Sequence, residues 1–123
     1  MRMPKTLVAA ASAVAILLSS PVIFSNASTT VQAGDMEDGK KVAFHRKKGN
    51  CLACHAIAGG KLPGNIGPPL VNMKQRFPNK ADLKAQIGNA TINNPNSIMP
   101  PYGAHKILSE KELDQVVEFI YSL

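Results

Sequence analysis

The chain holds only two cysteines, and both lie in one short motif, Cys-Leu-Ala-Cys-His, at residues 51–55. The thiols of Cys51 and Cys54 and the imidazole of His55 are thereby held within about one helical turn. Such a motif can form a redox-active disulfide, contribute to a zinc or iron–sulfur site, or anchor a haem. These alternatives place different demands on the rest of the chain.

Residues 1–33 have the pattern of a secretory signal peptide. Arg2 and Lys5 precede an apolar run at residues 7–18, and the acidic residues begin only at Asp35. We therefore expect an exported protein that is located in the periplasm.

Small residues end two candidate cleavage sites in this segment, at Ala27 and Ala33. We favour cleavage at Ala33, because a helical pattern begins just after it. An uncleaved membrane anchor is the alternative, since residues 7–24 approach the length that spans a bilayer. The sequence Ser-Ser-Pro at residues 19–21 interrupts that stretch, and we expect no membrane anchor.

Cleavage at Ala33 would leave one small domain, residues 34–123. At 90 residues, an apolar core alone gives only marginal stability, so a further stabilising element is expected. The domain has 12 basic and 8 acidic residues, a formal net charge of +4. This charge suits a mildly basic protein that docks on acidic partners, and it is too weak to indicate nucleic-acid binding.

The surrounding sequence disfavours three of the four alternatives for the motif. A thioredoxin-like disulfide would lie between a strand and a helix, and no βαβ pattern surrounds Cys51. A structural zinc site needs four ligands, and beyond the motif only His45 and His105 remain, at no finger-like spacing. An iron–sulfur cluster would normally use four cysteines, and the chain has two.

A covalently attached haem fits the motif directly. One helical turn holds the thiols of Cys51 and Cys54 close enough to add to the two vinyl groups of one porphyrin, and His55 follows to bind the iron. The porphyrin would also supply the missing part of the core. The sequence therefore predicts one c-type haem.

The sixth iron ligand is predicted to be Met99. Pro100 and Pro101 follow it, fix the backbone and exclude a helix, so the methionine stands on a stiff extended loop. A single methionine is more often a core residue, and other candidates stay open. These are Met36, Met73, His45 and His105.

A supporting group is predicted on the side of His55. The sequence Gly-Pro-Pro-Leu at residues 67–70 follows the motif, and a proline leaves a backbone carbonyl without a helical partner. We expect the carbonyl of Pro68 to accept the second ring N–H of His55, which would fix its tautomer and raise its donor strength. A turn before a short helix is the simpler alternative.

Two helices are predicted at the ends of the domain. The first covers residues 35–48, where Gly39 indicates a crossing with another helix because glycine otherwise weakens a helix. Ser109 and Glu112 form a capping box that opens the last helix, which runs to about Leu123 and packs near Gly39. Their apolar faces are Val42, Ala43 and Phe44 in the first helix, and Leu113, Val116, Val117, Ile120 and also Phe119 in the last.

Between them, Asn79 caps a predicted helix over residues 80–92, and a short helical stretch contains Met73. The apolar side of the longer helix is Leu83, Ile87 and Ile92, and the loop 93–103 then carries Met99. No segment alternates polar and apolar residues for long enough to predict a strand. The fold class is therefore all-α, with about four helices and loops wrapped around the haem.

The motifs GDMEDGKKVAF, CLACH and GPPL, the methionine loop and the terminal amphipathic helix, in this order, resemble class I cytochromes c over the whole mature chain. The finer resemblance is to the SoxX family, the single-haem subunits of SoxAX cytochrome complexes of bacterial thiosulfate oxidation. Three stretches carry it: residues 47–70, 83–103 and 108–123.

This resemblance implies roles for four residues and a set of partners. Cys51 and Cys54 would bind the haem, with His55 as proximal and Met99 as distal ligand. The partner would be a SoxA-type cytochrome subunit in a heterodimer, with transient contacts to SoxY–SoxZ and a downstream cytochrome. The chain has no third cysteine, so it would be the redox subunit of an L-cysteine S-thiosulfotransferase complex and not catalytic alone.

In that complex the chain would accept electrons from the coupling of thiosulfate to the SoxY cysteine. A free periplasmic electron shuttle is the alternative function. Tryptophan, common in class I cytochromes c, is absent, and Tyr102 is a candidate to replace it as a haem-propionate partner. A basic cluster before the motif could steer an acidic redox partner, or could be an ordinary solvated face. Its members are Lys40, Lys41, Arg46, Lys47 and Lys48.

Overall fold

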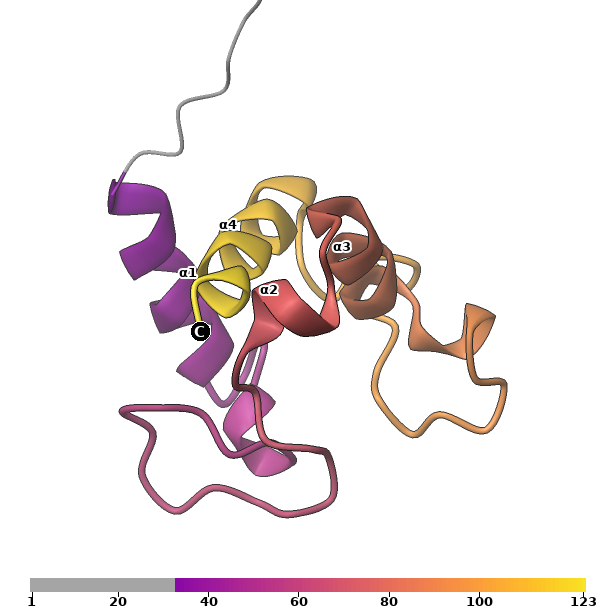
Figure 1. Ribbon diagram of the computed structural model, residues 1–123, viewed down its shortest axis with the longest axis horizontal. Coiled ribbons are helices and arrows are strands. Elements are labelled where there is room, and N and C mark those ends of the chain that lie inside the picture. Colours follow the sequence, from indigo (N-terminus) through magenta and orange to yellow (C-terminus); the bar gives the residue numbers. More distant parts are fainter. Residues whose placement is uncertain (1–32) are drawn as a thin grey trace, which may run out of the picture.

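The chain folds into helices joined by long loops. The computed structural model describes residues 33–123 (Figure 1). It contains four α-helices, α1 (Ala33–Phe44), α2 (Met73–Arg76), α3 (Lys80–Gly88) and α4 (Glu110–Tyr121), and two 3-10 helices, η1 (Cys51–Ala53) and η2 (Ala90–Ile92). Sheet pairing in the described residues is limited to an isolated parallel bridge between Ile57 and Leu70. The predicted all-α class with about four helices is confirmed.

The predicted signal peptide, residues 1–33, lies outside the described residues except for Ala33, where α1 begins. Its cleavage stays a prediction. Over residues 33–123, no helix is long and apolar enough to cross a membrane.

Helices α1 and α4 pack against each other at Gly39 (Figure 1). A Cβ atom on Gly39 would lie 1.9 Å from the carbonyl oxygen of Gln115 and 3.0 Å from the amide nitrogen of Val116. Only a residue without a side chain allows two backbones to approach this closely. Phe44 and Phe119 extend the contact as an edge-to-face pair with ring centroids 5.8 Å apart. The predicted crossing is confirmed.

Helix α4 begins with the predicted capping box. The Ser109 hydroxyl accepts the amide of Glu112 at 3.3 Å, and the Glu112 carboxylate accepts the amide of Ser109 at 3.0 Å. A hydrogen bond from Lys48, followed by those from Ser109, lowers the pKa of Glu112 to about 2. The carboxylate therefore stays ionised at neutral pH, and it ties the turn after α1 to the start of α4.

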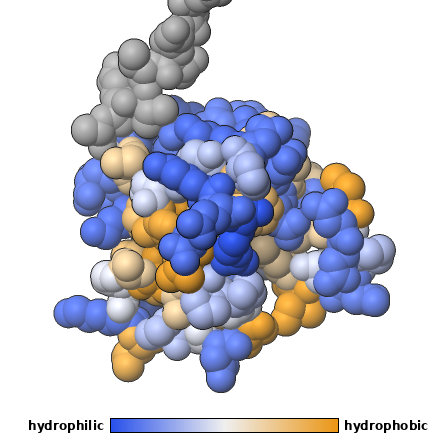
Figure 2. All heavy atoms as spheres, viewed as in Figure 1, coloured by the Kyte–Doolittle hydropathy of each residue, from blue (hydrophilic) through white to orange (hydrophobic). Residues whose placement is uncertain are grey.

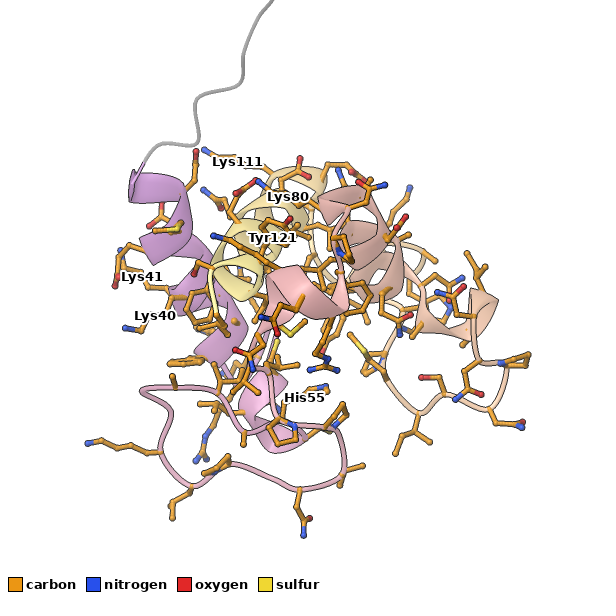
Figure 3. The ribbon with its side chains drawn as sticks, viewed as in Figure 1. Lys40, Lys41, His55, Lys80, Lys111 and Tyr121 are labelled. Atoms are coloured by element: carbon orange, nitrogen blue, oxygen red, sulfur yellow. The ribbon has the colours of Figure 1, made fainter. Side chains whose placement is uncertain are left out.

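The apolar face predicted for the last helix is buried in the core on α4. Its buried members are Leu113, Val116, Val117, Phe119 and Ile120. On the outer side, Lys80 of α3 pairs with Glu118 of α4 at 2.8 Å and lies 5.1 Å from the ring centroid of Tyr121 (Figure 3). Solvent-accessible pairs of this kind typically contribute about 1 kcal/mol or less, so apolar packing dominates the contact between α3 and α4.

The first helix is shorter than predicted, because α1 ends at Phe44 and not at Lys48. The carbonyl of Val42 accepts the amides of both His45 and Gly49, at 3.2 Å each, and this turns the chain back on itself. A Cβ on Gly49 would lie 2.7 Å from that same carbonyl oxygen. The turn therefore requires glycine at position 49, because a side chain there would collide with the backbone of Val42.

The helix predicted over residues 80–92 is also interrupted, since α3 ends at Gly88. Asn89 adopts an extended conformation (φ −160°, ψ 91°), and its side chain accepts the amide of Thr91 at 3.1 Å, which opens η2. Leu83 and Ile87 are buried as predicted. Ile92 was expected on the same apolar side and is 74% exposed, because the break at Asn89 changes the direction of the chain.

The crossing at Gly39 gives a direct test of this packing. We expect Gly39→Ala to lower the free energy of unfolding by about 1–3 kcal/mol, because the added methyl group overlaps the backbone of α4. Gly34→Ala, in the same helix, is the matched control, since a Cβ there meets nothing within 4 Å. Urea unfolding followed by far-ultraviolet circular dichroism measures both variants. Equal stabilities would contradict the close crossing.

Candidate haem-binding site

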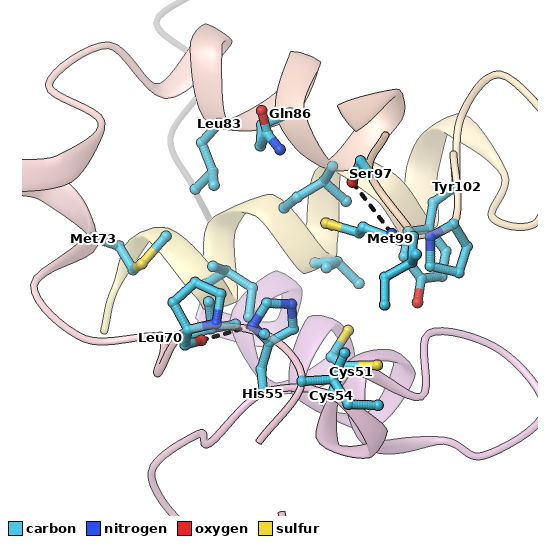
Figure 4. A pocket seen from close by; sticks show the side chains of 18 of the residues that line it. Cys51, Cys54, His55, Leu70, Met73, Leu83, Gln86, Ser97, Met99 and Tyr102 are labelled. Atoms are coloured by element: carbon cyan, nitrogen blue, oxygen red, sulfur yellow. Dashed lines mark hydrogen bonds between the residues drawn. The ribbon is translucent and has the colours of Figure 1, made fainter. Parts of the chain in front are cut away.

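A cavity of about 390 Å³ lies between the cysteine motif, α3, α4 and the loop before Tyr102 (Figure 4). This volume is within the range of roughly 300–1,000 Å³ that small-molecule and cofactor sites occupy. Its apolar wall includes Leu70, Leu83, Ile87, Val116 and Ile120. The residues predicted as haem attachments and ligands also line it: Cys51, Cys54, His55 and Met99. The fold thus brings all four to one space.

The cysteine motif is held by the short helix η1. Asn50 precedes it in a left-handed conformation (φ 47°, ψ 33°), and the amide of His55 donates to the carbonyl of Cys51 at 2.9 Å. The two thiols and the imidazole are consequently presented to the same cavity (Figure 4).

The environment of the Cys51 thiol differs from that of an activated redox thiol. Both cysteines are free, and burial raises the pKa of the Cys51 thiol to about 11. Redox-active CxxC motifs instead have a cysteine with a lowered pKa, because the thiolate is the nucleophile. Among the described residues, no group of three or more His, Cys, Asp or Glu side chains could hold a metal ion. The geometry therefore gives no support to the disulfide or zinc alternatives.

The loop after the motif fixes the His55 ring. Its Nδ1 lies 2.7 Å from the carbonyl oxygen of Pro68, and since a carbonyl can only accept, Nδ1 carries the proton. The Gly67 amide donates to the carbonyl of Cys54 at 2.8 Å, and a Cβ on Gly67 would lie 2.6 Å from Nδ1. The ring is thus packed against a glycine backbone, and its other nitrogen, Nε2, is left as the possible metal ligand.

Met99 is half-buried at the far side of the same cavity, on the loop between η2 and Tyr102 (Figure 4). Its amide donates to the hydroxyl of Ser97 at 3.3 Å, and Pro100 and Pro101 follow without helical structure. Met99 therefore lies on a non-helical segment, as expected from Pro100 and Pro101.

The rival ligands are placed less favourably. Met36, His45 and His105 are exposed and do not line the cavity. Met73 does line it, yet it is only 2% exposed at the start of α2, and its sulfur accepts a hydrogen bond from Arg76 at 3.4 Å. Of the two methionines at the cavity, Met99 is the one whose sulfur has no hydrogen-bond donor among the described residues.

Tyr102 has a different partner from the one expected. Its hydroxyl donates at 2.5 Å to the carbonyl of Gly49, just before the motif. Burial, and then the nearby Cys51 and Cys54, raise the pKa of Tyr102 to about 12, so it stays protonated. Because its single proton is used in this bond, the suggestion that it donates to a haem propionate is not supported. Its observed role is to tie the methionine loop to the motif.

Three further residues at the site escaped the sequence reasoning. A Cβ on Gly64 would lie 1.9 Å from the carbonyl oxygen of Ala53, so the loop passes directly over η1. Gly67 contacts the imidazole as described above, and Arg76 contacts both Met73 and the proline segment. The available signal for close backbone approach was the pair of glycines at positions 64 and 67, in the loop that follows the motif.

The predicted basic cluster is partly neutralised by acidic neighbours. Lys41 pairs with Asp38 at 3.1 Å, and Lys48 pairs with Glu112. In Figure 3, Lys40 and Lys41 project from the outer side of α1. The cluster residues without an ion pair in the described part of the chain are Lys40, Arg46 and Lys47.

Comparison with known proteins places this geometry in a family. The family model described as cytochrome c oxidase, cbb3-type, subunit III, matches residues 34–120. A chain in the crystal structure of SoxXA from P. pantotrophus is similar, with 25% identity and a TM-score of 0.64, over 71% of this chain and 80% of that chain. No curated protein matches the sequence.

The chain belongs to this cytochrome c family, and its fold is that of a class I cytochrome c. Membership implies a haem c, and the cavity with two thiols, an imidazole and a thioether on its wall fits such a group. More particularly, the likeness to a SoxXA chain, together with the resemblance in sequence, identifies it as a SoxX-like cytochrome.

The bond between Tyr102 and Gly49 gives a second testable prediction. We expect Tyr102→Phe to lower the free energy of unfolding by about 1–3 kcal/mol, because the buried Gly49 carbonyl loses its donor. Tyr121→Phe is the control, since the Tyr121 hydroxyl bonds the carbonyl of Pro78 at an exposed position and should change stability much less. Denaturant unfolding compares the two variants. An equal or greater loss in Tyr121→Phe would contradict the link between loop and motif.

Proposed function

We propose that this protein carries one haem c and transfers single electrons. Cys51 and Cys54 would attach the haem, and His55 and Met99 would ligate its iron. The observation that carries the proposal is that these four side chains, from two separate segments, line one largely apolar cavity. The haem, when bound, supplies an iron that takes up and releases one electron, and the methionine–histidine pair favours a high reduction potential.

The residues of the chain orient the ligands and exclude water. The Pro68 carbonyl holds the Nδ1 proton of His55, which leaves Nε2 as the donor nitrogen and increases its basicity. The stiff segment after Met99 holds the thioether without a helix. Buried side chains of α3 and α4 form the opposite wall and lower the local dielectric constant.

The physiological partner that we propose is a SoxA-type cytochrome subunit. Support comes from the similarity to a chain of SoxXA and from the cysteine content. Both cysteines of this chain lie in the haem motif, so a thiol for sulfur chemistry would have to come from a partner. In this function the protein accepts electrons from the coupling of thiosulfate to the SoxY cysteine of SoxY–SoxZ, and passes them to another cytochrome.

The mouth of the cavity has the apolar surface that such a partner needs. Ile66 and Ile98 both line the cavity and are 63% and 77% exposed, and Leu62, on the same loop as Ile66, is 94% exposed. Figure 2 shows separate groups of hydrophobic atoms at the lower left and lower right of the molecule, with hydrophilic atoms between them. Exposed apolar side chains at the rim of a cavity would be buried by a partner that covers it.

We further propose that the protein is exported and acts in the periplasm after cleavage of residues 1–33. The pattern of the N-terminal segment and the covalent haem motif support this location. A free periplasmic electron shuttle is the second candidate function. It is favoured by Lys40, Arg46 and Lys47, which form no ion pair within residues 33–123 and could guide transient encounters.

The proposed ligand set predicts a change of spectrum on substitution of Met99. We expect Met99→Ala to abolish the long-wavelength absorption band that a thioether–iron bond gives in the oxidised protein. Met73→Ala, the control at the same cavity, should retain the band and lose about 2–5 kcal/mol of stability through the vacated core volume. Absorption spectra of both holoproteins test this. A band that survives in Met99→Ala would contradict the assignment.

The proposed partner predicts stable association through the cavity mouth. We expect the chain to co-purify with a co-expressed SoxA-type subunit, and Ile98→Asp to weaken the complex at least about tenfold, the cost of desolvating a charge at an interface. Ile92→Asp is the matched control, because Ile92 is 74% exposed but does not line the cavity. Calorimetric titration measures both. A monomer that binds no such subunit and reduces several unrelated acceptors would favour the shuttle.

A further inference from the structure

Arg76, at the end of α2, contacts the loop that holds His55. Its Nη1 donates to the carbonyl oxygen of Pro69 at 2.8 Å and to the sulfur of Met73 at 3.4 Å. Arg76 also lines the cavity, and it forms no ion pair with an acidic side chain in the described residues. Its guanidinium therefore interacts with neutral acceptors at the edge of the site.

The dipeptide Pro68–Pro69, which Arg76 contacts, has few hydrogen-bonding groups of its own. The residues on either side of it are anchored through their amides, since Gly67 donates to the carbonyl of Cys54 at 2.8 Å and Leu70 donates to the carbonyl of Ala56 at 2.9 Å. Pro68 and Pro69 between them have no N–H groups. Their carbonyl oxygens are consequently the only backbone hydrogen-bonding groups of this dipeptide.

Each of these two carbonyls has one side-chain partner. The Pro68 carbonyl accepts the Nδ1 proton of His55 at 2.7 Å, and the next carbonyl, of Pro69, accepts from Arg76. The planar peptide unit that carries the Pro68 oxygen ends at the Cα atom of Pro69. The ring of Pro69 fixes φ at that atom, so ψ of Pro69 is the one soft rotation between the two carbonyls. A hydrogen bond that holds the Pro69 carbonyl therefore also restricts the position of the Pro68 oxygen. A hydrogen bond from a charged donor is also stronger than one from a neutral donor.

We propose that Arg76 is a positioning residue for the imidazole: through Pro69, it holds the Pro68 carbonyl in place as the acceptor of the His55 ring proton. The same guanidinium donates to the thioether of Met73, the second methionine at the cavity, and so holds its sulfur beside α2. This inference rests on the proposed function, in which His55 is an axial ligand.

The test compares Arg76→Gln with Lys74→Gln in the reduced holoprotein. Lys74 lies in the same short helix, is exposed, and faces the Tyr121 ring at 5.9 Å, so its replacement makes the same change of charge without touching the proline segment. Proton NMR measures solvent exchange of the His55 Nδ1 proton and of the Leu70 amide. We expect both to exchange about tenfold faster in Arg76→Gln, the effect of losing one charged hydrogen bond.

The chemical shift of the His55 Nδ1 proton is the second measurement. We expect it to move upfield in Arg76→Gln, because a weaker hydrogen bond deshields the proton less, and to stay at the wild-type value in Lys74→Gln. The amide of Val116, in the core of α4, should exchange at the wild-type rate in both variants. Should Arg76→Gln fail to fold, Arg76→Lys, which keeps the charge but lacks the planar guanidinium, is measured in the same way with the same expectations.

Wild-type exchange and shift of the His55 proton in the Arg76 variants would overturn the proposal. It would also be overturned by an equal acceleration at Val116, since that would show general loss of stability and no positioning of the ring. These results would leave the haem and its ligands unaffected. A wild-type protein that stays colourless after expression with a competent haem-attachment system would contradict the proposed function instead.

Discussion

The structure depends on filling one apolar cavity with a large group. Side chains that form the core, such as Leu83, Val116 and Ile120, are also the wall of this space. A group that fills this space would bury the apolar side chains of its wall, and burial of apolar surface is worth roughly 25 cal/mol per Å². A small domain has only about 5–15 kcal/mol of stability in all. Attachment of such a group through the two cysteines would therefore be coupled to folding of the chain.

The sequence predicted the parts of the fold that depend on local chemistry. The capping box of Ser109 and Glu112 lies within one turn, and the crossing at Gly39 follows from the cost of glycine in a helix. The ends of α1 and α3 could not be predicted in this way. Helix α1 ends because the chain turns back and the Gly49 amide donates to the carbonyl of Val42. Helix α3 ends because the Asn89 side chain accepts the amide of Thr91, a bond that competes with the helical pattern. The local sequence pattern favours a longer helix at both places, and contacts formed only in the folded state determine where each helix ends.

The candidate site shows the same division. Cys51, Cys54 and His55 are adjacent in the sequence, and two prolines mark Met99, so residue types alone indicated them. The roles of Tyr102 and Arg76 depend on contacts across the fold, from Tyr102 to Gly49 and from Arg76 to Pro69. Neither contact leaves a pattern in the sequence, because a tyrosine hydroxyl and a guanidinium can reach many backbone carbonyls. Prediction from sequence therefore identified the candidate haem attachments and ligands, and the Pro68 carbonyl beside His55, but it did not identify the contacts of Tyr102 and Arg76 that form only in the fold.

The distribution of charge and apolar surface bears on the choice between subunit and shuttle. Transient redox encounters depend on charge and are weakened by salt. Here two of the five clustered basic residues, Lys41 and Lys48, already have acidic partners, which reduces the field that could steer an acceptor. The exposed apolar residues at the cavity mouth, Ile66 and Ile98, would instead be buried by a lasting interface. The apolar mouth belongs to the candidate haem cavity, whereas the basic residues lie on the outer side of α1 and in the turn after it. The surface therefore supports the proposed subunit role over the shuttle.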